Sequence, residues 1–207
     1  MYAQFGCGYT APKGWRNFDA SPTLKWERTP VLGRLYTKNP QRFPPAVECG
    51  DIIKGLPISD GSCQGLFASH VLEHLSLEDF HKALENSRRV MKKGGIFRLV
   101  VPDLEWAAKE YLAGVAAGNS EANTIFIDNT SLGVKKRAKN LLQFFYQFLA
   151  TSTHLWMWDA PSLQAALAQH GFINIRRCYF GDCEDAMFKL VEDAGRFENA
   201  VAMEARC

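Results

Sequence analysis

MYAQFGCGYTAPKGWRNFDASP, residues 1–22, is the stretch of sequence that decides the fold. It opens with an apolar run at residues 2–5, which predicts a strand, and the turn Gly6-Cys7-Gly8 follows. A second apolar run at residues 15–18 ends on Asp19. In open α/β sheets, glycines at such a turn let the backbone approach an adenosine-type cofactor, and an acid after the next strand accepts hydrogen bonds from its ribose. The stretch therefore predicts two strands of a cofactor-binding sheet.

The composition is typical of one globular domain. The chain has 207 residues, 47% of them hydrophobic and 22% charged, and this length suits one domain with a full core. A formal net charge of +2 predicts no nucleic-acid partner. We expect no signal peptide and no transmembrane segment, because the chain lacks an apolar run of the length that either needs. The six cysteines are scattered without a C-x-x-C pair, which predicts reduced thiols and a cytoplasmic location.

Strands and helices alternate along the rest of the chain. Short apolar runs predict strands at residues 46–49, 65–69, 96–101, 172–180 and 199–206. Helical spacing and capping residues predict helices at 24–36, 76–91, 104–117, 135–150 and 159–171. Residues 92–94 (Lys-Lys-Gly) suit the end of a helix, and residues 118–133 are predicted to be irregular. The alternation predicts a doubly wound, Rossmann-like α/β fold with a mostly parallel sheet.

Several motifs in this order resemble those of class I S-adenosylmethionine-dependent methyltransferases, over most of the chain. The motif FASHVLEHL at residues 67–75 is similar to the fourth-strand signature of the type 11 subgroup, and RVMKKGG at 89–95 to its helix-to-fifth-strand turn. The segments HLWMWD at 154–159 and Gly171-Phe172 resemble a subset linked to surface-polysaccharide synthesis. The resemblance implies S-adenosylmethionine as the cofactor and a small molecule or saccharide as the methyl acceptor, with oxygen as the expected nucleophile.

The first loop departs from the pattern of that family. Gln4 stands where the family usually has an acid, and Thr10 lies in the region of the missing third glycine. The gap between Gly8 and Trp15 is too short for the first crossover helix, since parallel strands need a connection of about a dozen residues or more. Either this helix is reduced to a loop or the two strands are not neighbours.

The resemblance also implies a cofactor site. Gly6 and Gly8 would approach the methionine part, and Asp19 would hold the ribose hydroxyls. Asp51 would accept from the adenine amino group and Ile52 would pack on the ring. The remaining two residues, Ser69 and His70, would lie near the methionine and the substrate. Without the resemblance, Asp19 and Asp51 are ordinary turn-forming aspartates.

A hydroxyl acceptor must lose a proton, and histidine is suited to accept it near neutral pH. His154 is the first candidate for this general base, in an aromatic loop that could close over the site. His70 and Asp103 follow, each at the carboxyl end of a predicted strand, where ligands gather in such sheets. The alternatives are a packed histidine that fixes the loop for His154, and a helix-packing role for His74.

The segment from His70 to His74 also fits H-x-x-E-H, a zinc-peptidase pattern in which Glu73 would be the base. The segment directly follows a buried strand in a doubly wound sheet, and the sequence shows no third ligand. We therefore predict no metal site.

The helix predicted at residues 135–150 begins with basic residues and continues with aromatic ones. It suits a lid over the acceptor site, a surface that contacts an anionic lipid-linked or phosphorylated glycan, or an amphipathic core helix with a solvated charged start. We predict a single domain over residues 1–207 with a lid-like helical insertion at about 104–158. Two other functions fit: a non-catalytic binding module or partner subunit, because of the short first loop and Gln4, and a nicotinamide oxidoreductase, because the glycine turn and Asp19 suit both cofactors.

Overall fold

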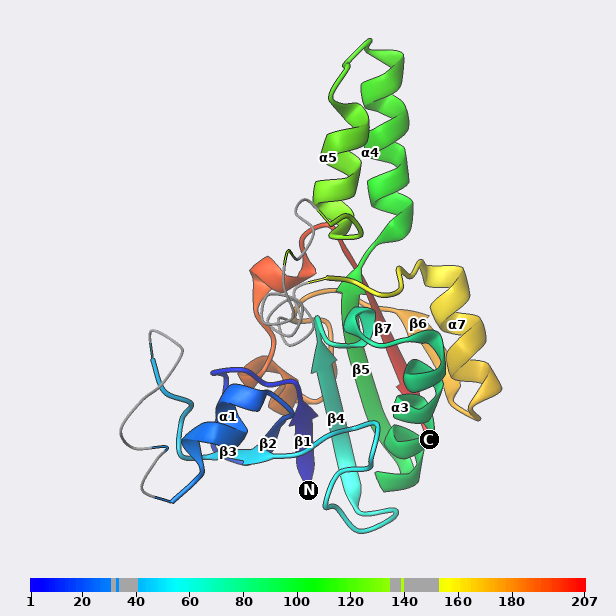
Figure 1. Ribbon diagram of the computed structural model, residues 1–207. Helices are drawn as coiled ribbons and strands as arrows, with labels where there is room; N and C mark the ends of the chain where they lie inside the picture. Colours follow the sequence, from blue (N-terminus) through cyan, green and yellow to red (C-terminus); the bar gives the residue numbers. More distant parts are fainter. Residues whose placement is uncertain (31–32, 34–40, 135–138, 140–152) are drawn as a thin grey trace.

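A computed structural model describes residues 1–30, 33, 41–134, 139 and 153–207. Its described strands form one seven-stranded sheet in the order β3-β2-β1-β4-β5-β7-β6 (Figure 1). The strands are β1 (Tyr2–Phe5), β2 (Trp15–Asp19), β3 (Val47–Cys49), β4 (Cys63–Ser69), β5 (Met91–Pro102), β6 (Ile173–Arg177) and β7 (Ala200–Arg206). β1 to β5 pair in parallel, and β7 runs antiparallel to both β5 and β6. The predicted Rossmann-like, mostly parallel sheet is confirmed.

The helices flank this sheet (Figure 1). They are α1 (Pro22–Glu27), α3 (Leu77–Val90), α4 (Leu104–Ala116), α5 (Ala122–Thr130) and α7 (Ala160–Gln169), with short 3-10 turns η1 (Leu72–His74), η2 (Ala186–Leu190) and η3 (Ala194–Phe197). α3 begins where the sequence indicates, because the Ser76 hydroxyl accepts a hydrogen bond from the Asp79 backbone N–H at 3.1 Å. None of the described helices is long and apolar enough to cross a membrane.

β1 and β2 are parallel neighbours although only residues 6–14 connect them. This connection contains no helix, so the reduced first crossover is confirmed. Gln4, which is buried, holds the loop in place: its side-chain amide donates to the Thr10 carbonyl and to Asn17 Oδ1, both at 2.7 Å. The residue that departs from the family pattern therefore stabilises the short loop.

β5 is an interior strand between β4 and β7, and its alternation builds a core on each face of the sheet. Phe97, Leu99 and Val101 pack into the larger core cluster, while Ile96 and Val100 pack into a second one. The strand is longer than residues 96–101, and residues 92–94 lie within it rather than at a helix end. Met91 pairs with Cys63 of β4 and regular pairing resumes between Ile96 and Gly65, so residues 92–94 form an irregular stretch within the strand.

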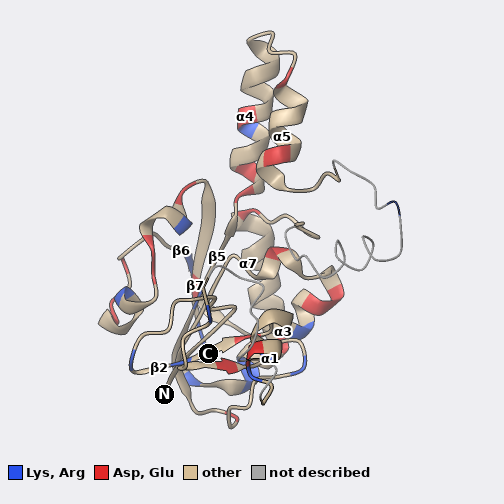
Figure 2. Ribbon diagram, turned by 60° about the vertical axis from the view of Figure 1, so that its left-hand side comes forward, with Lys and Arg blue, Asp and Glu red and all other residues tan. Residues whose placement is uncertain are grey.

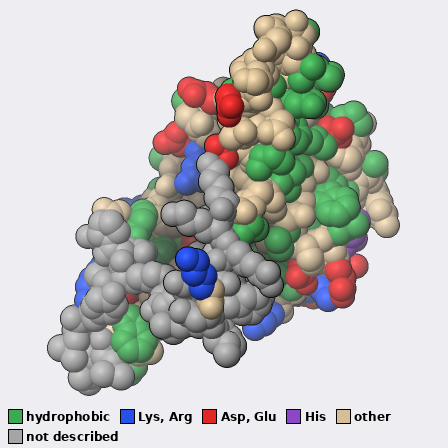
Figure 3. Space-filling model, turned by 45° about the horizontal axis from the view of Figure 1, so that its top comes forward, with side chains coloured by type: hydrophobic (Ala, Val, Ile, Leu, Met, Phe, Trp, Pro, Cys, Tyr) green, Lys and Arg blue, Asp and Glu red, His purple; other side chains and the backbone are tan. Residues whose placement is uncertain are grey.

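α4 and α5 form a helical hairpin that stands away from the sheet, on the side where the parallel strands end (Figure 1). The prediction that residues 118–133 are irregular is wrong, because α5 occupies most of this range. Acidic residues outnumber basic ones on the hairpin (Figure 2), and Leu112, Val115 and Ile125 are exposed there. Figure 3 shows hydrophobic side chains gathered on the face seen from above. The basic and aromatic helix expected at 135–150 lies outside the described residues, except for Lys139.

Candidate active site

The residues predicted to bind the cofactor follow the carboxyl ends of four neighbouring strands. β1 pairs in parallel with β2 and with β4, and their last residues lie side by side. Gly6 follows β1, Asp19 ends β2 and Ser69 ends β4. Asp51 follows β3, which pairs with the end of β2. The fold thus gathers these residues along one edge of the sheet, the edge at which ligands bind in open α/β folds.

The two glycines of the first loop have left-handed backbone, with φ of +62° at Gly6 and +53° at Gly8, a conformation that other residues adopt only with strain. A Cβ atom at Gly6 would lie 2.1 Å from Cγ2 of Val71. At Gly8 a Cβ atom would meet no described atom within 4 Å. Packing inside the protein therefore requires glycine at position 6, and Gly8 is the glycine whose backbone faces open space.

Asp19 closes the short loop with its carboxylate. Oδ2 accepts from the Gly8 N–H at 3.0 Å, and Oδ1 accepts from the Ser21 N–H at 2.8 Å. Each carboxylate oxygen has two lone pairs, so one acceptor position on each remains for ribose hydroxyls. Asp19 is 9% exposed, which leaves a narrow approach to those positions.

Asp51 lies beyond β3 and is partly exposed, with Oδ1 accepting from the Ile53 N–H at 3.0 Å. Ile52 is buried in the larger core cluster, so most of its side chain packs inside the protein. At the end of β4, the Ser69 hydroxyl oxygen is buried and has no hydrogen-bond partner among the described residues. The open backbone at Gly8, the remaining acceptor positions of Asp19 and this unpaired hydroxyl fit an adenosine-type ligand along the edge.

The three candidates for the general base line one cavity of about 280 Å³. His70 follows β4, Asp103 follows β5, and His154 lies in the segment that leads to α7. Trp106 of α4 and Met157 form part of the apolar wall. The segment that carries His154 is fixed beside the end of β5, because the Leu104 N–H donates to the Trp158 carbonyl at 2.8 Å. Residues that are far apart in the sequence therefore meet at this cavity.

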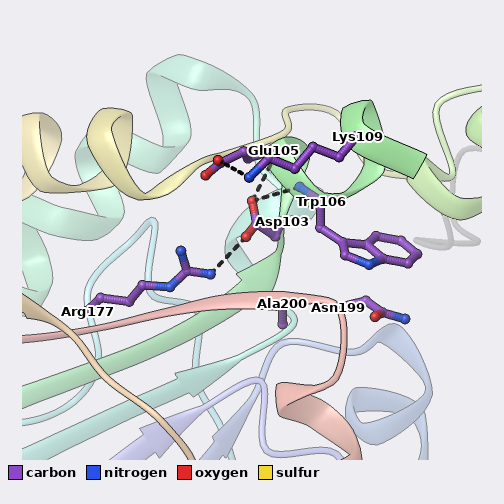
Figure 4. Close-up of a pocket in the computed structure, with 7 residues that line it drawn as sticks. All are labelled: Asp103, Glu105, Trp106, Lys109, Arg177, Asn199 and Ala200. Atoms are coloured by element: carbon purple, nitrogen blue, oxygen red, sulfur yellow. Dashed lines mark hydrogen bonds and ion pairs between the residues drawn. The ribbon is translucent and has the colours of Figure 1, made fainter. Parts of the chain in front are cut away.

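Asp103 has both carboxylate oxygens engaged (Figure 4). Oδ1 caps α4 by accepting from the Glu105 N–H at 2.8 Å, and Oδ2 accepts from the Arg177 guanidinium at 3.0 Å. It also lines a neighbouring cavity of about 310 Å³ with Lys109 and Asn199. A capped and paired carboxylate suits positioning of α4 at the cavity rather than proton transfer.

Three of the five histidines surround Glu73, whose side chain is 1% exposed. His70 Nδ1 lies 3.4 Å and His74 Nε2 3.9 Å from Glu73 Oε1. The His154 ring centroid lies 5.1 Å from that of His74. Burial opposes protonation of His70, but the nearby Glu73 carboxylate and the hydrogen bond to the Arg196 carbonyl outweigh it and raise the pKa of His70. For His154, burial lowers the pKa.

The sequence does not predict the cavity residues that lie outside the methyltransferase-like motifs. Trp106, Met157 and Asn199 line the cavity, but no local signal marks them. Glu73 was considered only as part of H-x-x-E-H. The structure places His74 in a 3-10 turn and brings His154 beside it, so a third side chain able to bind a metal lies next to Glu73 and His74.

The fold and this edge are those of a Rossmann-like α/β chain, and comparison with known proteins gives methyltransferases as similar chains. Residues 28–99 match the family model described as a methyltransferase domain. A methyltransferase structure from Archaeoglobus fulgidus aligns with 100% of this chain and 85% of its own, at TM-score 0.51 and 15% identity. One from Mesorhizobium loti aligns with 100% and 90%, at TM-score 0.52 and 11% identity. The comparison with curated protein sequences gives no match.

These findings support one class of enzyme. The likeness to the solved structures shows the fold, and the family-model match supports an S-adenosylmethionine-dependent methyltransferase with S-adenosylmethionine as its cofactor. A methyltransferase implies a methyl acceptor, and the cavity lined by His70, Asp103 and His154 is a candidate place for it.

Proposed function

We propose that the protein transfers the methyl group of S-adenosylmethionine to a hydroxyl oxygen of a small molecule or saccharide. The observation that carries this proposal is the shared cavity, which joins two histidines and a carboxylate at the carboxyl ends of β4 and β5. A link to surface-polysaccharide synthesis is part of the proposal and rests on the resemblance of residues 154–159. The free state of all six cysteines supports a cytoplasmic location.

Each part of the site has a task in this reaction. The Gly8 backbone, Asp19, Asp51 and Ser69 would hold the cofactor, which supplies a methyl group on a positively charged sulfur. The protein's main contribution is to orient acceptor and methyl group in a site that excludes water. Trp106 of α4 and Asn129 of α5 line the cavity, which supports the α4–α5 hairpin as part of a lid-like insertion at about 104–158 in a single domain.

His154 is the favoured proton acceptor. Its Nδ1 is buried and has no hydrogen-bond partner among the described residues. A neutral imidazole in the lining of the cavity can take the proton of an acceptor hydroxyl. His70 is less suited, because its Nε2 donates to the Arg196 carbonyl at 2.8 Å and its Nδ1 faces Glu73.

The first test is calorimetric titration of the purified protein with S-adenosylmethionine and S-adenosylhomocysteine. A hydrogen bond to a charged group contributes about 1.5–3 kcal/mol, so Asp19→Asn should weaken binding by about tenfold or more. The exposed Glu110→Ala on α4 is the control and should bind like the native protein. Absence of binding by the native protein would instead favour a non-catalytic module or a subunit that needs a partner.

The acceptor requires a second assay. The protein is incubated with S-adenosylmethionine and a panel of hydroxylated small molecules and saccharides, and release of S-adenosylhomocysteine is followed. We expect turnover with a hydroxyl acceptor and a reduced maximal rate for His154→Gln, with cofactor binding unchanged. Methylation of amines but not hydroxyls in such a panel would contradict the oxygen assignment.

A further inference from the structure

Glu73 is a buried carboxylate without a matching donor. Its side chain is 1% exposed, and neither oxygen has a hydrogen-bond partner among the described residues. Burying an unpaired carboxylate costs several kcal/mol. The backbone of Glu73 is fixed by a hydrogen bond, since the Leu155 N–H donates to the Glu73 carbonyl at 2.7 Å. A cation bound beside this carboxylate would offset the cost of burying its charge.

The His74 nitrogen that faces Glu73 carries a lone pair rather than a proton. His74 Nδ1 lies 3.1 Å from the Thr153 carbonyl. A carbonyl can only accept, so this nitrogen carries the proton and Nε2, which faces Glu73, is the lone-pair nitrogen of the neutral ring. His70 also has one nitrogen on a backbone carbonyl, since its Nε2 donates to the Arg196 carbonyl at 2.8 Å and its Nδ1 faces Glu73. A metal-binding histidine typically has one nitrogen bonded to a backbone carbonyl in this way.

His154 completes the cluster from a different part of the chain. Its Nδ1 is buried and unpaired among the described residues. One ligand atom from each of Glu73, His74 and His154 lies within 4.8 Å of the other two. Ligand atoms around zinc are about 3.3 Å apart, so binding requires only a modest closure of these side chains around an ion.

We propose that Glu73, His74 and His154 bind a divalent transition metal such as Zn²⁺. Imidazole nitrogens with one carboxylate are ligands that suit zinc and its neighbours rather than Mg²⁺ or Ca²⁺. This revises the absence of a metal that the sequence predicts, because the missing third ligand is His154, 80 positions after His74 in the chain.

The proposed ion would lie at the wall of the acceptor cavity, since His154 also lines it. This consequence rests on the proposed function, whereas metal binding itself does not. With a metal bound, His154 would serve as a ligand rather than as a proton acceptor, and the ion would supply the acidity that the acceptor hydroxyl needs, because a hydroxyl on a divalent metal loses its proton far more easily than a free one.

The test is a Zn²⁺ titration of the full chain after treatment with a chelator, in the absence of cofactor and acceptor. Cys49 is the exposed cysteine, so all variants are made in a Cys49→Ser background. We expect one Zn²⁺ per chain by elemental analysis. Glu73→Gln and His74→Ala should each weaken binding by about tenfold or more, as loss of a ligand exceeds the effect of an outer partner. The change Glu73→Gln keeps the shape of the side chain and removes its charge.

The chain offers a matched control in its other two histidines. His81 Nδ1 lies 2.8 Å from His170 Nε2, away from Glu73. His170→Ala should bind Zn²⁺ like the parent protein, and Zn²⁺ should raise the unfolding temperature of both but not that of Glu73→Gln. Absence of stoichiometric Zn²⁺ binding, or its loss in His170→Ala with Glu73→Gln unaffected, would overturn the proposal. Cofactor titrations on the same samples show separately whether the proposed methyl transfer site fails.

Discussion

At the scale of single residues, the two glycines of the first loop look equivalent in sequence but serve different purposes. A Cβ atom at Gly6 would meet Val71, while one at Gly8 faces open space. We predict that Gly6→Ala lowers the free energy of unfolding by about 2–5 kcal/mol, from left-handed strain and overpacking together. Gly8→Ala should cost only the strain, about 1–2 kcal/mol. Urea unfolding of both variants measures the difference.

A double variant separates the two causes at Gly6. Gly6→Ala combined with Val71→Ala removes the methyl group that the new Cβ would strike. The pair should therefore be less destabilised than the sum of its single changes, by more than the roughly 0.5 kcal/mol expected for independent sites. Strict additivity would show that backbone strain alone explains the requirement for glycine.

At the scale of elements, the start of α7 is a capping box. Asp159 Oδ1 accepts from the Ser162 N–H at 2.9 Å, and the Ser162 hydroxyl accepts from the Asp159 N–H at 3.2 Å. The hydrogen bonds from Ser162 hold the pKa of Asp159 below its ordinary value. A depressed pKa means that the carboxylate stabilises the fold above the unfolded-state pKa, and that this is lost as the pH falls through the folded-state value.

We predict that Asp159→Ala lowers the free energy of unfolding by about 1 kcal/mol at pH 7. The difference from the native protein should shrink as the pH is lowered below about 4, the ordinary pKa of aspartate. Urea unfolding at pH 7 and pH 3.5 compares the two proteins. A difference that stays constant over this range would show that the neutral side chain caps equally well.

Local signals account for what the sequence predicts about these elements. Apolar runs locate β1, β2, β3 and β7 within about a residue, and Asp159 marks the start of α7, because each depends on neighbours in sequence. α5 was missed because its residues lack a helical apolar face. Its stability comes from contact with α4, including the Tyr111–Phe126 ring pair.

In the candidate site as well, the sequence predicts single residues but not how they are arranged. His70, Asp103 and His154 were proposed one by one, but their meeting at one cavity depends on the fold. Glu73 looks like a helix residue in sequence, and only tertiary structure shows that its carboxylate is buried among three histidines. Sequence patterns report such a cluster only when its members are close in the chain.

At the scale of the whole molecule, a buried ionic ladder ties the antiparallel end of the sheet together. Arg98 of β5, Glu204 of β7 and Arg176 of β6 are cross-strand neighbours in register. Arg98 is fully buried and lies 2.6 Å from Glu204, 2.9 Å from Asp182 and 2.8 Å from Glu192. The acidic partners come from β7 and from the segment between β6 and β7. The Arg98 guanidinium therefore links β5 to both of these parts of the chain.

Removing this cation should therefore lower the free energy of unfolding by an amount that depends on pH. Burial already raises the pKa of Glu192. Without Arg98, the buried carboxylates lose the positive charge that balances their negative charges. We predict that Arg98→Met lowers the free energy of unfolding by about 3–5 kcal/mol near pH 7. Carboxyl groups with a raised folded-state pKa favour the fold when protonated, and this is lost as the pH rises. The penalty should thus be smaller at pH 5 than at pH 7.5 in urea unfolding. Lys109→Met, which breaks an exposed ion pair with Glu105, is the control and should change stability little at either pH, because exposed ion pairs are screened by solvent. An Arg98→Met penalty as small as that of the control would show that the ladder is dispensable.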